Sequence, residues 1–317
     1  MNSKILITGA SGFIARSIVC YVARSRKYEV SCLTRHVVNE RVAGAVYHPP
    51  SPEYLVTDFI SALVGIDVVV HCAARAHVIT DRVANPLAAF RAVNVNGTLN
   101  LAAQAARAGV KRFVFISSIG VNGLHTDKEQ SYTENDYPFP HNDYALSKWE
   151  AEQGLLKIAR ETGLEVVIIR PPLVYGPNAP GNFGSLMNAV KRGLPLPLGA
   201  IHNQRSLVAL DNLVDFIITC INHPNAANQT FLVSDGHDLS TFELIRTMAK
   251  AAGVPARLIP VPVPMLQLVG KLLGKGDAVQ RLCGNLQVDI SKARNLLNWS
   301  PPISVEEGIR RAMMGSV

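Results

Sequence analysis

Short apolar runs alternate with segments long enough for helices, and this alternation limits the possible folds more than any other feature of the chain. Five runs read as strands: Lys4 to Thr8, Tyr28 to Thr34, Asp67 to His71, Arg112 to Ser117 and Glu165 to Arg170. Helix-length segments lie between them, at Ser11 to Arg24, Pro86 to Ala108 and Asp143 to Thr162. Strands that are apolar on both faces and alternate with helices predict a parallel sheet covered on both sides. We therefore expect a doubly wound α/β fold.

The texture of the sequence changes after Arg170. Pro171-Pro172 and Gly176-Pro177 begin a stretch rich in chain-breaking residues, and shorter elements follow. With 317 residues, of which 48% are hydrophobic, the chain can form one large core and a further lobe. We expect a first domain over residues 1–172 and a smaller lobe over 173–317, partly interleaved with it. Ser206 to Ala209 is a candidate for a strand that returns to the main sheet.

The first strand breaks at once into a turn of small residues that opens a helix. Gly9 and Gly12 are spaced as the first two glycines of a dinucleotide-binding turn, and Ala15 stands where a third glycine would allow close helix packing. The helix that follows offers unpaired N–H groups and a positive dipole end to an anion. The first domain is therefore expected to bind a dinucleotide, and the second lobe mainly a substrate.

The end of the second strand bears on which dinucleotide binds. A carboxylate there binds the adenosine ribose of NAD, whereas a cation accepts the 2′-phosphate of NADP. The sequence has Thr34-Arg35 and no acid, so NADP(H) is favoured and NAD(H) stays open. Asp58 lies too near the next strand to bind adenine, and we expect it to cap the helix that begins near Phe59.

A second group of residues indicates the chemistry. Tyr144 and Lys148 lie one helical turn apart on a single face, and Ser118 follows the strand that ends at Ser117. A tyrosine keeps its proton until about pH 10, so a nearby ammonium that favours the phenolate would make it a usable acid or base. In an open parallel sheet, these positions and the opening turn all face the ligand crevice.

Composition excludes several other classes of protein. The formal net charge is +7, but the basic residues are spread out, so a small phosphorylated ligand explains them and no nucleic-acid partner is expected. The five cysteines are scattered and show neither a disulfide framework nor a metal-ligand spacing, so no metal is expected. The chain shows no signal-peptide pattern and no apolar run of membrane-spanning length, which predicts a cytoplasmic protein.

Together these motifs resemble the extended short-chain dehydrogenase/reductase family, which includes nucleotide-sugar epimerases, dehydratases and ketoreductases. The similar segments run over most of the chain: Thr8 to Ala15, His71 to Ala74, Asn94 to Thr98, Phe115 to Ser118, Tyr144 to Lys148, Arg170 to Pro177 and Arg205 to Asp211. The resemblance implies reversible hydride transfer at a sugar carbon. It makes Tyr144 the acid and base, gives Lys148 the nicotinamide ribose, and has Ser118 orient the substrate oxygen.

The resemblance also implies which residues line the ligands. For the cofactor these are Gly9, Ser11, Gly12, Phe13, Ile14, Thr34, Arg35, Ala73, Ala74, Asn94, Lys148 and Pro171. For the substrate they are Asn122, Asn182, Arg205 and Arg281, of which the last three resemble contacts to a nucleotide diphosphate. Relatives often dimerise through helices that flank the sheet, so a homodimer is consistent with the resemblance.

Three functions remain open at this point. Ile119-Gly120 stands where dehydratases of the family carry an acidic pair, which argues against dehydration. The NADP-like site and the similarity of Phe115 to Gly123, Leu286 to Asp289 and Asn298-Trp299 to bacterial reductases favour reduction of a UDP-4-keto-6-deoxy-N-acetylhexosamine in surface-polysaccharide synthesis. The alternative enzyme is a UDP-hexose 4-epimerase, acting on UDP-glucose or UDP-N-acetylglucosamine. A more distant alternative is a regulator that senses nucleotides without catalysis.

Overall fold

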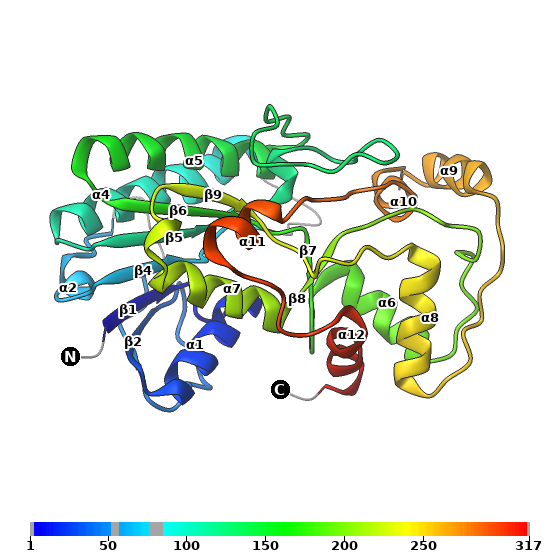
Figure 1. Ribbon diagram of the computed structural model, residues 1–317, viewed down its shortest axis with the longest axis horizontal. Helices are drawn as coiled ribbons and strands as arrows, with labels where there is room; N and C mark the ends of the chain where they lie inside the picture. The colour runs from blue at the N-terminus through cyan, green and yellow to red at the C-terminus, as the bar shows by residue number, and fades with distance from the viewer. Residues whose placement is uncertain (1–2, 52–56, 77–84, 275, 316–317) are drawn as a thin grey trace.

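A seven-stranded parallel sheet organises the computed structural model, which describes residues 3–51, 57–76, 85–274 and 276–315 (Figure 1). The strand order is β3-β2-β1-β4-β5-β6-β9. The strands are β1 (Ser3–Thr8), β2 (Tyr28–Leu33), β3 (Ala45–Tyr47), β4 (Val68–His71), β5 (Arg112–Ile116), β6 (Glu165–Arg170) and β9 (Gln229–Leu232). The order reverses between β1 and β4, and at such a switch point the loops after the two strands diverge and leave a crevice.

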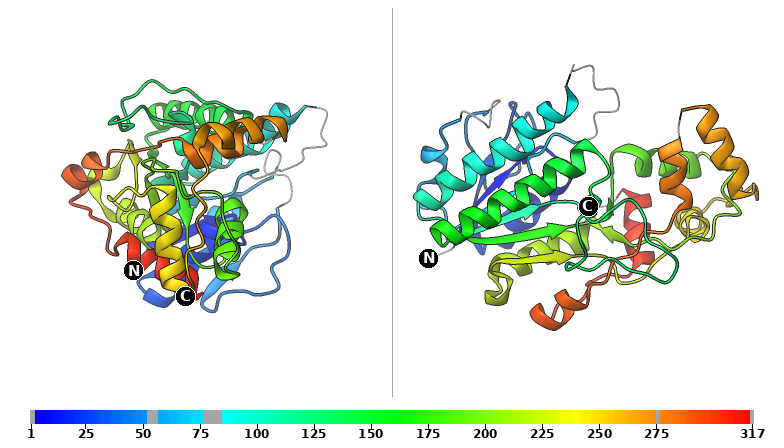
Figure 2. Two further views of the ribbon diagram at one scale, coloured as in Figure 1. Left: turned by 90° about the vertical axis from the view of Figure 1, so that its right-hand side faces the viewer. Right: turned by 90° about the horizontal axis from the view of Figure 1, so that it is seen from above.

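Helices cover both faces of this sheet (Figures 1 and 2). On one face lie α2 (Ile60–Leu63), α4 (Thr98–Arg107) and α5 (Asp143–Thr162), and on the other α1 (Phe13–Ser25), α7 (Leu210–Asn222) and α11 (Ser291–Leu297). Side chains of β1 alternate between the two resulting cores, with Leu6 in one and Ile5 and Ile7 in the other. This confirms the doubly wound α/β fold, because both faces of each central strand are buried.

The second part of the molecule packs around a two-stranded sheet of β7 (Leu173–Tyr175) and β8 (Leu207–Ala209). Three helices form its core with these strands: α6 (Gly181–Lys191), α8 (Thr241–Ala252) and α12 (Val305–Met314). Outside them lie α9 (Val263–Leu272) and α10 (Gly276–Cys283), at the upper right of Figure 1. The Tyr175 hydroxyl donates to Asp235 at 2.6 Å, which ties β7 to the loop after β9.

One expectation about individual elements is wrong, and the structure refines two others. Ser206 to Ala209 does not return to the main sheet, since β8 pairs with β7, and the strand that does return is β9. The segment Pro86 to Ala108 is not one α-helix but α3 (Pro86–Phe90), a π-helical stretch at Arg91–Gly97 and then α4. Asp58 does accept a hydrogen bond from the N–H of Ile60 at 2.9 Å, but it lies one residue before the helix's N-cap position.

Candidate active site

The backbone of the turn after β1 packs directly against the backbone of the loop after β4. Gly9 has a φ of +67°, and a Cβ at this position would lie 2.9 Å from the backbone of Ala73, after β4. The Gly12 N–H donates to the Gly9 carbonyl at 2.8 Å and closes the turn. Glycine is needed at Gly9 for both its conformation and its contact.

The first turn of α1 is open to an anion. Gly12 occupies the N-cap position, no side chain caps the helix, and its first turn has no acidic residue. Ser11 and Gly12 are exposed, whereas Phe13 and Ile14 are half-buried at the start of the helix. Unpaired amides and the helix dipole thus face the crevice, and this donor set fits the diphosphate of a dinucleotide.

Asn94 holds the loop after β4 against α5. It is fully buried in the π-helical stretch, where its side-chain amide donates to the Arg75 carbonyl at 3.1 Å and to the Ser147 hydroxyl at 3.0 Å. Its amide oxygen accepts the Arg75 N–H at 2.7 Å. Ala73 and Ala74, at the start of this loop, are half-buried beside the opening turn. The loop is therefore held in one position relative to both β1 and α5.

A buried histidine joins the same elements, and sequence reasoning missed its role. The Ala73 N–H donates to the Thr8 hydroxyl, which lies 2.8 Å from His71 Nδ1, and His71 Nε2 lies 3.0 Å from the Thr98 hydroxyl. Thr98 donates in turn to the Asn94 carbonyl, so the hydrogen bonds run in one direction and require a neutral imidazole with its proton on Nε2. Burial, with the Lys148 charge nearby, lowers the pKa of His71 to about 3.

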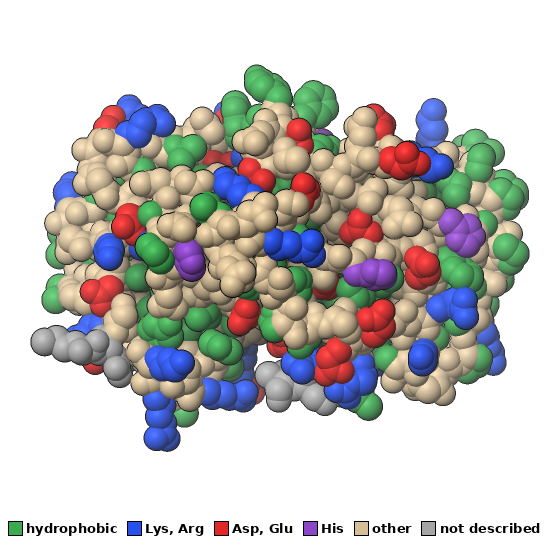
Figure 3. Space-filling model, viewed as in Figure 1, with side chains coloured by type: hydrophobic (Ala, Val, Ile, Leu, Met, Phe, Trp, Pro, Cys, Tyr) green, Lys and Arg blue, Asp and Glu red, His purple; other side chains and the backbone are tan. Residues whose placement is uncertain are grey.

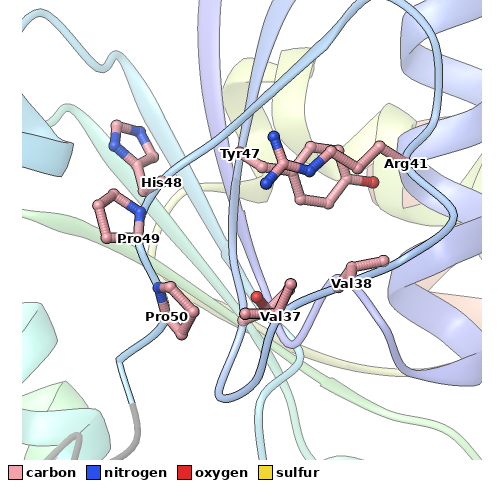
Figure 4. A pocket seen from close by; sticks show the side chains of 8 residues that line it. Val37, Val38, Arg41, Tyr47, His48, Pro49 and Pro50 are labelled. Carbon is pink, nitrogen blue, oxygen red and sulfur yellow. The ribbon is translucent and has the colours of Figure 1, made fainter.

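The end of β2 borders a cavity of about 190 Å³ (Figure 4). Its lining residues are Thr34, Val37, Val38, Arg41, Tyr47, His48, Pro49 and Pro50. The Arg41 guanidinium lies 5.4 Å from the centre of the Tyr47 ring. Arg35 is exposed and is not part of this lining. Among the residues that line the cavity, the arginine is therefore Arg41. The sequence alone favours Arg35, which lies six residues earlier in the chain.

Ser118 follows the end of β5 and lies near the start of α5, the helix that carries Tyr144. Asn142 caps α5 by accepting the Ala145 N–H at 2.8 Å, and Tyr144 follows in the first turn. Ser118 accepts the Gly120 N–H at 3.1 Å, and a Cβ on Gly120 would lie 3.3 Å from both the Ser118 hydroxyl and the Ala145 Cβ. Ser118 thus lies beside the first turn of α5.

Burial dominates the electrostatics of the tyrosine and lysine. It raises the pKa of Tyr144 to about 12, so the expected lowering of this pKa by the ammonium is not observed. Burial also lowers the pKa of Lys148 to about 8, against the opposing effect of Glu152. The Lys148 ammonium lies 4.1 Å from the centre of the Phe115 ring. At neutral pH both groups are protonated, with the lysine close to its midpoint.

Behind these residues lies a buried ion pair. Arg170, the last residue of β6, donates to Glu152 of α5 at 2.6 and 3.0 Å, and Ser117 also donates to Glu152. Arg170 donates as well to the Asn122 amide oxygen at 2.9 Å, and the Asn122 amide donates to the Thr133 carbonyl at 2.9 Å. Asn122 is 1% exposed. Both ends of its side chain are engaged within the protein, which gives Asn122 a positioning role, and the expected substrate contact stays a prediction.

The remaining expected residues lie on the side of the crevice toward the second lobe. Pro171 is buried after β6, and its carbonyl accepts the Ile119 N–H at 3.0 Å, which fixes the segment that follows Ser118. Asn182 is exposed in the first turn of α6. Neither position contradicts the expected contact, and neither establishes it.

Two arginines from different elements lie close together. Arg205 comes just before β8 and donates to the Gly284 carbonyl at 3.0 Å, while Arg281 is exposed on α10. Burial and then the Arg281 charge lower the pKa of Arg205 to about 10. A pair of guanidinium groups that repel each other is suited to a polyvalent anion such as a diphosphate.

Within the described residues, no group of three or more His, Cys, Asp or Glu side chains could hold a metal ion. The search of the same residues for a helix of the length and apolarity needed to span a bilayer found none.

The parallel sheet with its open glycine turn, together with the serine after β5 and the tyrosine and lysine on α5, is typical of the class of short-chain dehydrogenases/reductases. The family model described as "NAD dependent epimerase/dehydratase family" matches residues 5–234. This chain belongs to that family.

Individual relatives agree with this assignment. The chain is 49% identical to the UDP-glucose 4-epimerase of Vibrio cholerae over 312 residues, which are 98% of this chain and 94% of the relative. Among solved structures, UDP-glucose 4-epimerase of Thermotoga maritima with UDP-glucose superposes with a TM-score of 0.80 at 25% identity, covering 98% of both chains. UDP-glucuronic acid 4-epimerase of Bacillus cereus in complex with NAD superposes with a TM-score of 0.79 at 21% identity, covering 98% of this chain and 96% of that one, and shows the shared fold.

Proposed function

We propose that the protein is a UDP-hexose 4-epimerase that uses NAD. The observation that carries this proposal is the 49% identity, over 98% of the chain, to a UDP-glucose 4-epimerase. The relatives thus favour the epimerase, which the sequence left as the alternative, over the ketoreductase that it favoured. The family description also names NAD, which favours NAD over the expected NADP.

The residues of the opening turn fit a dinucleotide. In this proposal the amides at Ser11 and Phe13 bind its diphosphate, Gly12 closes the turn between them, and Ile14 packs beside them. Ala73, Ala74 and Asn94 form the wall on the β4 side, and Pro171 borders the nicotinamide. When bound, the cofactor supplies the acceptor and donor of hydride at sugar carbon 4.

Side chains of this protein would transfer the proton at the sugar oxygen. Tyr144 would take the proton from the C4 hydroxyl and later return it to the C4 carbonyl, so one phenol serves both directions. Ser118 would donate a hydrogen bond that holds this oxygen in place. Burial raises the pKa of Tyr144 to about 12 in the protein without ligands. In this proposal the positive charge of Lys148, one helical turn away, would favour the phenolate once cofactor and substrate are bound.

The UDP half of the substrate would be held from the second lobe. Arg205 and Arg281 form the cationic pair there, and Asn182 lies in the first turn of α6. Guanidinium groups bind phosphate oxygens through two parallel hydrogen bonds. Such anchoring would leave the hexose free to turn, so that either face of its carbon 4 can be presented to the cofactor.

The decisive experiment is the stoichiometry of cofactor use. The purified protein is incubated with UDP-glucose or UDP-N-acetylglucosamine, without added reductant, and the sugars are resolved by chromatography. An epimerase forms the C4 epimer to equilibrium with no net consumption of cofactor, and Tyr144→Phe serves as the inactive control. Consumption of one NADPH per UDP-4-keto-6-deoxy-N-acetylhexosamine, with no epimer formed from either UDP-hexose, would contradict the proposal.

One observation keeps the ketoreductase as a second candidate. The end of β2 has no carboxylate, and Arg41 lies beside the cavity there. A cation at this place favours the 2′-phosphate of NADP. Titration of NAD and NADP against the wild type and against Arg41→Ala and Arg35→Ala tests this point. Tighter binding of NADP that is lost only in Arg41→Ala would favour the reductase, and equal losses would leave Arg41 without a role in selectivity.

A further inference from the structure

Helix α9 has an apolar stripe that faces away from the protein. Met265, Leu268, Val269 and Leu272 are 57%, 61%, 51% and 77% exposed, and Leu273 at the helix end is 66% exposed. The first four follow the spacing i, i+3, i+4 and i+7, which places them on one face of a helix. We call these five residues the α9 stripe. In Figure 3, apolar side chains gather along the right-hand edge, where Figure 1 shows α9.

The opposite face of α9 anchors the helix. Val263 and Leu266 pack against the core of the second lobe, and Gly270 is buried. The helix also packs along α10. Helix α9 is therefore packed against the protein through its opposite face. The α9 stripe is exposed although the helix itself is anchored. An exposed apolar face of this size marks a binding surface.

The charge of the surrounding segment indicates what the stripe binds. Residues 244–274 contain no Asp or Glu, and they contain Arg246, Lys250, Arg257 and Lys271, whereas Asp277 follows near the start of α10. Lys271 lies exposed on α9 itself. An apolar helical face with a lysine on the same helix, in a segment of the chain rich in cations, complements an anionic lipid surface. A second copy of the chain is disfavoured, because a two-fold contact between stripes would bring the same cations together.

We propose that the α9 stripe is a docking surface for an anionic lipid membrane. Its apolar side chains enter the boundary between lipid headgroups and acyl chains, while Lys271 extends to the lipid phosphates. Because α10 carries Arg281 and packs against α9, docking brings the cationic end of the crevice near the bilayer. The proposal does not depend on which reaction the crevice performs.

The test is the binding of the purified full chain to sedimented vesicles. Vesicles of equal parts phosphatidylglycerol and phosphatidylcholine should bind the protein, and vesicles of phosphatidylcholine alone should bind it several-fold less. The double variant Leu268→Glu/Leu272→Glu should lower the partition coefficient by about tenfold or more, because two inserted apolar groups become charged. Lys271→Ala should lower it by about fivefold.

Val64→Glu is the matched control, because Val64 is 73% exposed but lies after α2, apart from α9. It should bind vesicles as the wild type does, and all variants should unfold at the wild-type temperature, since each change is on the surface. Equal binding by the wild type and the double variant would overturn the proposal. A wild-type dimer that the double variant converts to a monomer, without vesicle binding by either, would assign the stripe to a second copy instead.

Discussion

Tyr144 is the residue on which the proposed chemistry depends most. Its ring packs edge-on against Phe90 with 6.2 Å between the ring centres, and burial raises its pKa to about 12. The change Tyr144→Phe keeps this packing and removes only the hydroxyl. We expect kcat to fall by about a thousandfold, because the acid and base at the sugar oxygen is lost. Affinity for NAD, measured by calorimetry, should change less than about threefold.

The control for this experiment is Tyr137→Phe. Tyr137 is 86% exposed in the loop before α5, so removal of its hydroxyl should leave kcat unchanged. If Tyr144→Phe kept more than a tenth of wild-type turnover, another group would have to move the proton and the proposed role would be wrong.

His71 makes the stability of the protein sensitive to acid. Its pKa is about 3 in the folded protein, against about 6.5 in an unfolded chain, so below pH 6.5 the unfolded state binds more protons. The stabilisation that rests on the neutral ring is present above pH 6.5 and lost as the pH falls toward 3. We expect a loss of about 1.4 kcal/mol of unfolding free energy per pH unit in this window.

Urea unfolding of the wild type and of His71→Gln at pH 7, 5.5 and 4.5 measures this contribution. Gln cannot gain a proton, so the difference in unfolding free energy between the two proteins should shrink as the pH falls. A difference that stays constant across the three pH values would show that His71 takes up a proton as readily in the folded state as in the unfolded state.

At the scale of elements, the β1–α1 turn depends on the contact between Gly9 and Ala73. Gly9→Ala meets both a positive φ and a backbone 2.9 Å from the new Cβ. Gly109→Ala is the matched control, because Gly109 has a φ of +80° and nothing within 4 Å of a Cβ. The control should lose about 1 to 2 kcal/mol of unfolding free energy, and Gly9→Ala at least about 1 kcal/mol more.

Gly9→Ala and Gly109→Ala also distinguish an effect on stability from an effect on cofactor binding. Gly9→Ala shifts the turn that precedes the open amides of α1, so its affinity for NAD should fall by about tenfold or more, whereas Gly109→Ala should bind NAD normally. Calorimetric titration measures both. Normal binding by Gly9→Ala would mean that the turn does not hold the diphosphate.

The elements that sequence predicted well are those with a local cause. β1, β6 and α5 follow from apolar runs and from the cap at Asn142, and their predicted bounds differ from the observed ones by one residue at most. The π-helical stretch could not be predicted, because it places Asn94 against Arg75 and Ser147, which are distant in sequence. β3 and β9 are short, with three and four residues, and only pairing with the sheet identifies them.

In the candidate site, too, residues in local patterns can be predicted from the sequence, and residues that meet only in the fold cannot. The sequence alone proposes Gly9, Tyr144 and Lys148 as candidates, because a turn and a helical spacing are visible in it. The Glu152 and Arg170 pair joins a helix to a strand across the core, so no local pattern reveals it. Such a buried pair forms only when the fold brings both charges together, since either charge alone would be costly to bury.

At the scale of the whole molecule, the two proposed ligands, NAD and the UDP-sugar, would be bound by different parts of the protein. The dinucleotide turn belongs to the main sheet, whereas Arg205 and Arg281 come from the segment before β8 and from α10. Arg205 also bridges the backbone of Leu239 and Leu286. Binding of UDP would therefore tie α10 to the centre of the second lobe, and changes at one ligand site need not affect the other.

Arg281→Ala tests this separation. Loss of one guanidinium should lower affinity for UDP by about tenfold, because charge-assisted hydrogen bonds to phosphate are lost, and affinity for NAD should stay unchanged. Without ligand, the variant should be as stable as the wild type or more stable, since the repulsion that helps lower the pKa of Arg205 is removed. The rise in unfolding temperature caused by UDP should then be smaller than in the wild type.

The control is Arg192→Ala. Arg192 is exposed at the end of α6, so this variant should bind UDP normally. Equal UDP affinity in all three proteins would show that the arginine pair does not hold the diphosphate.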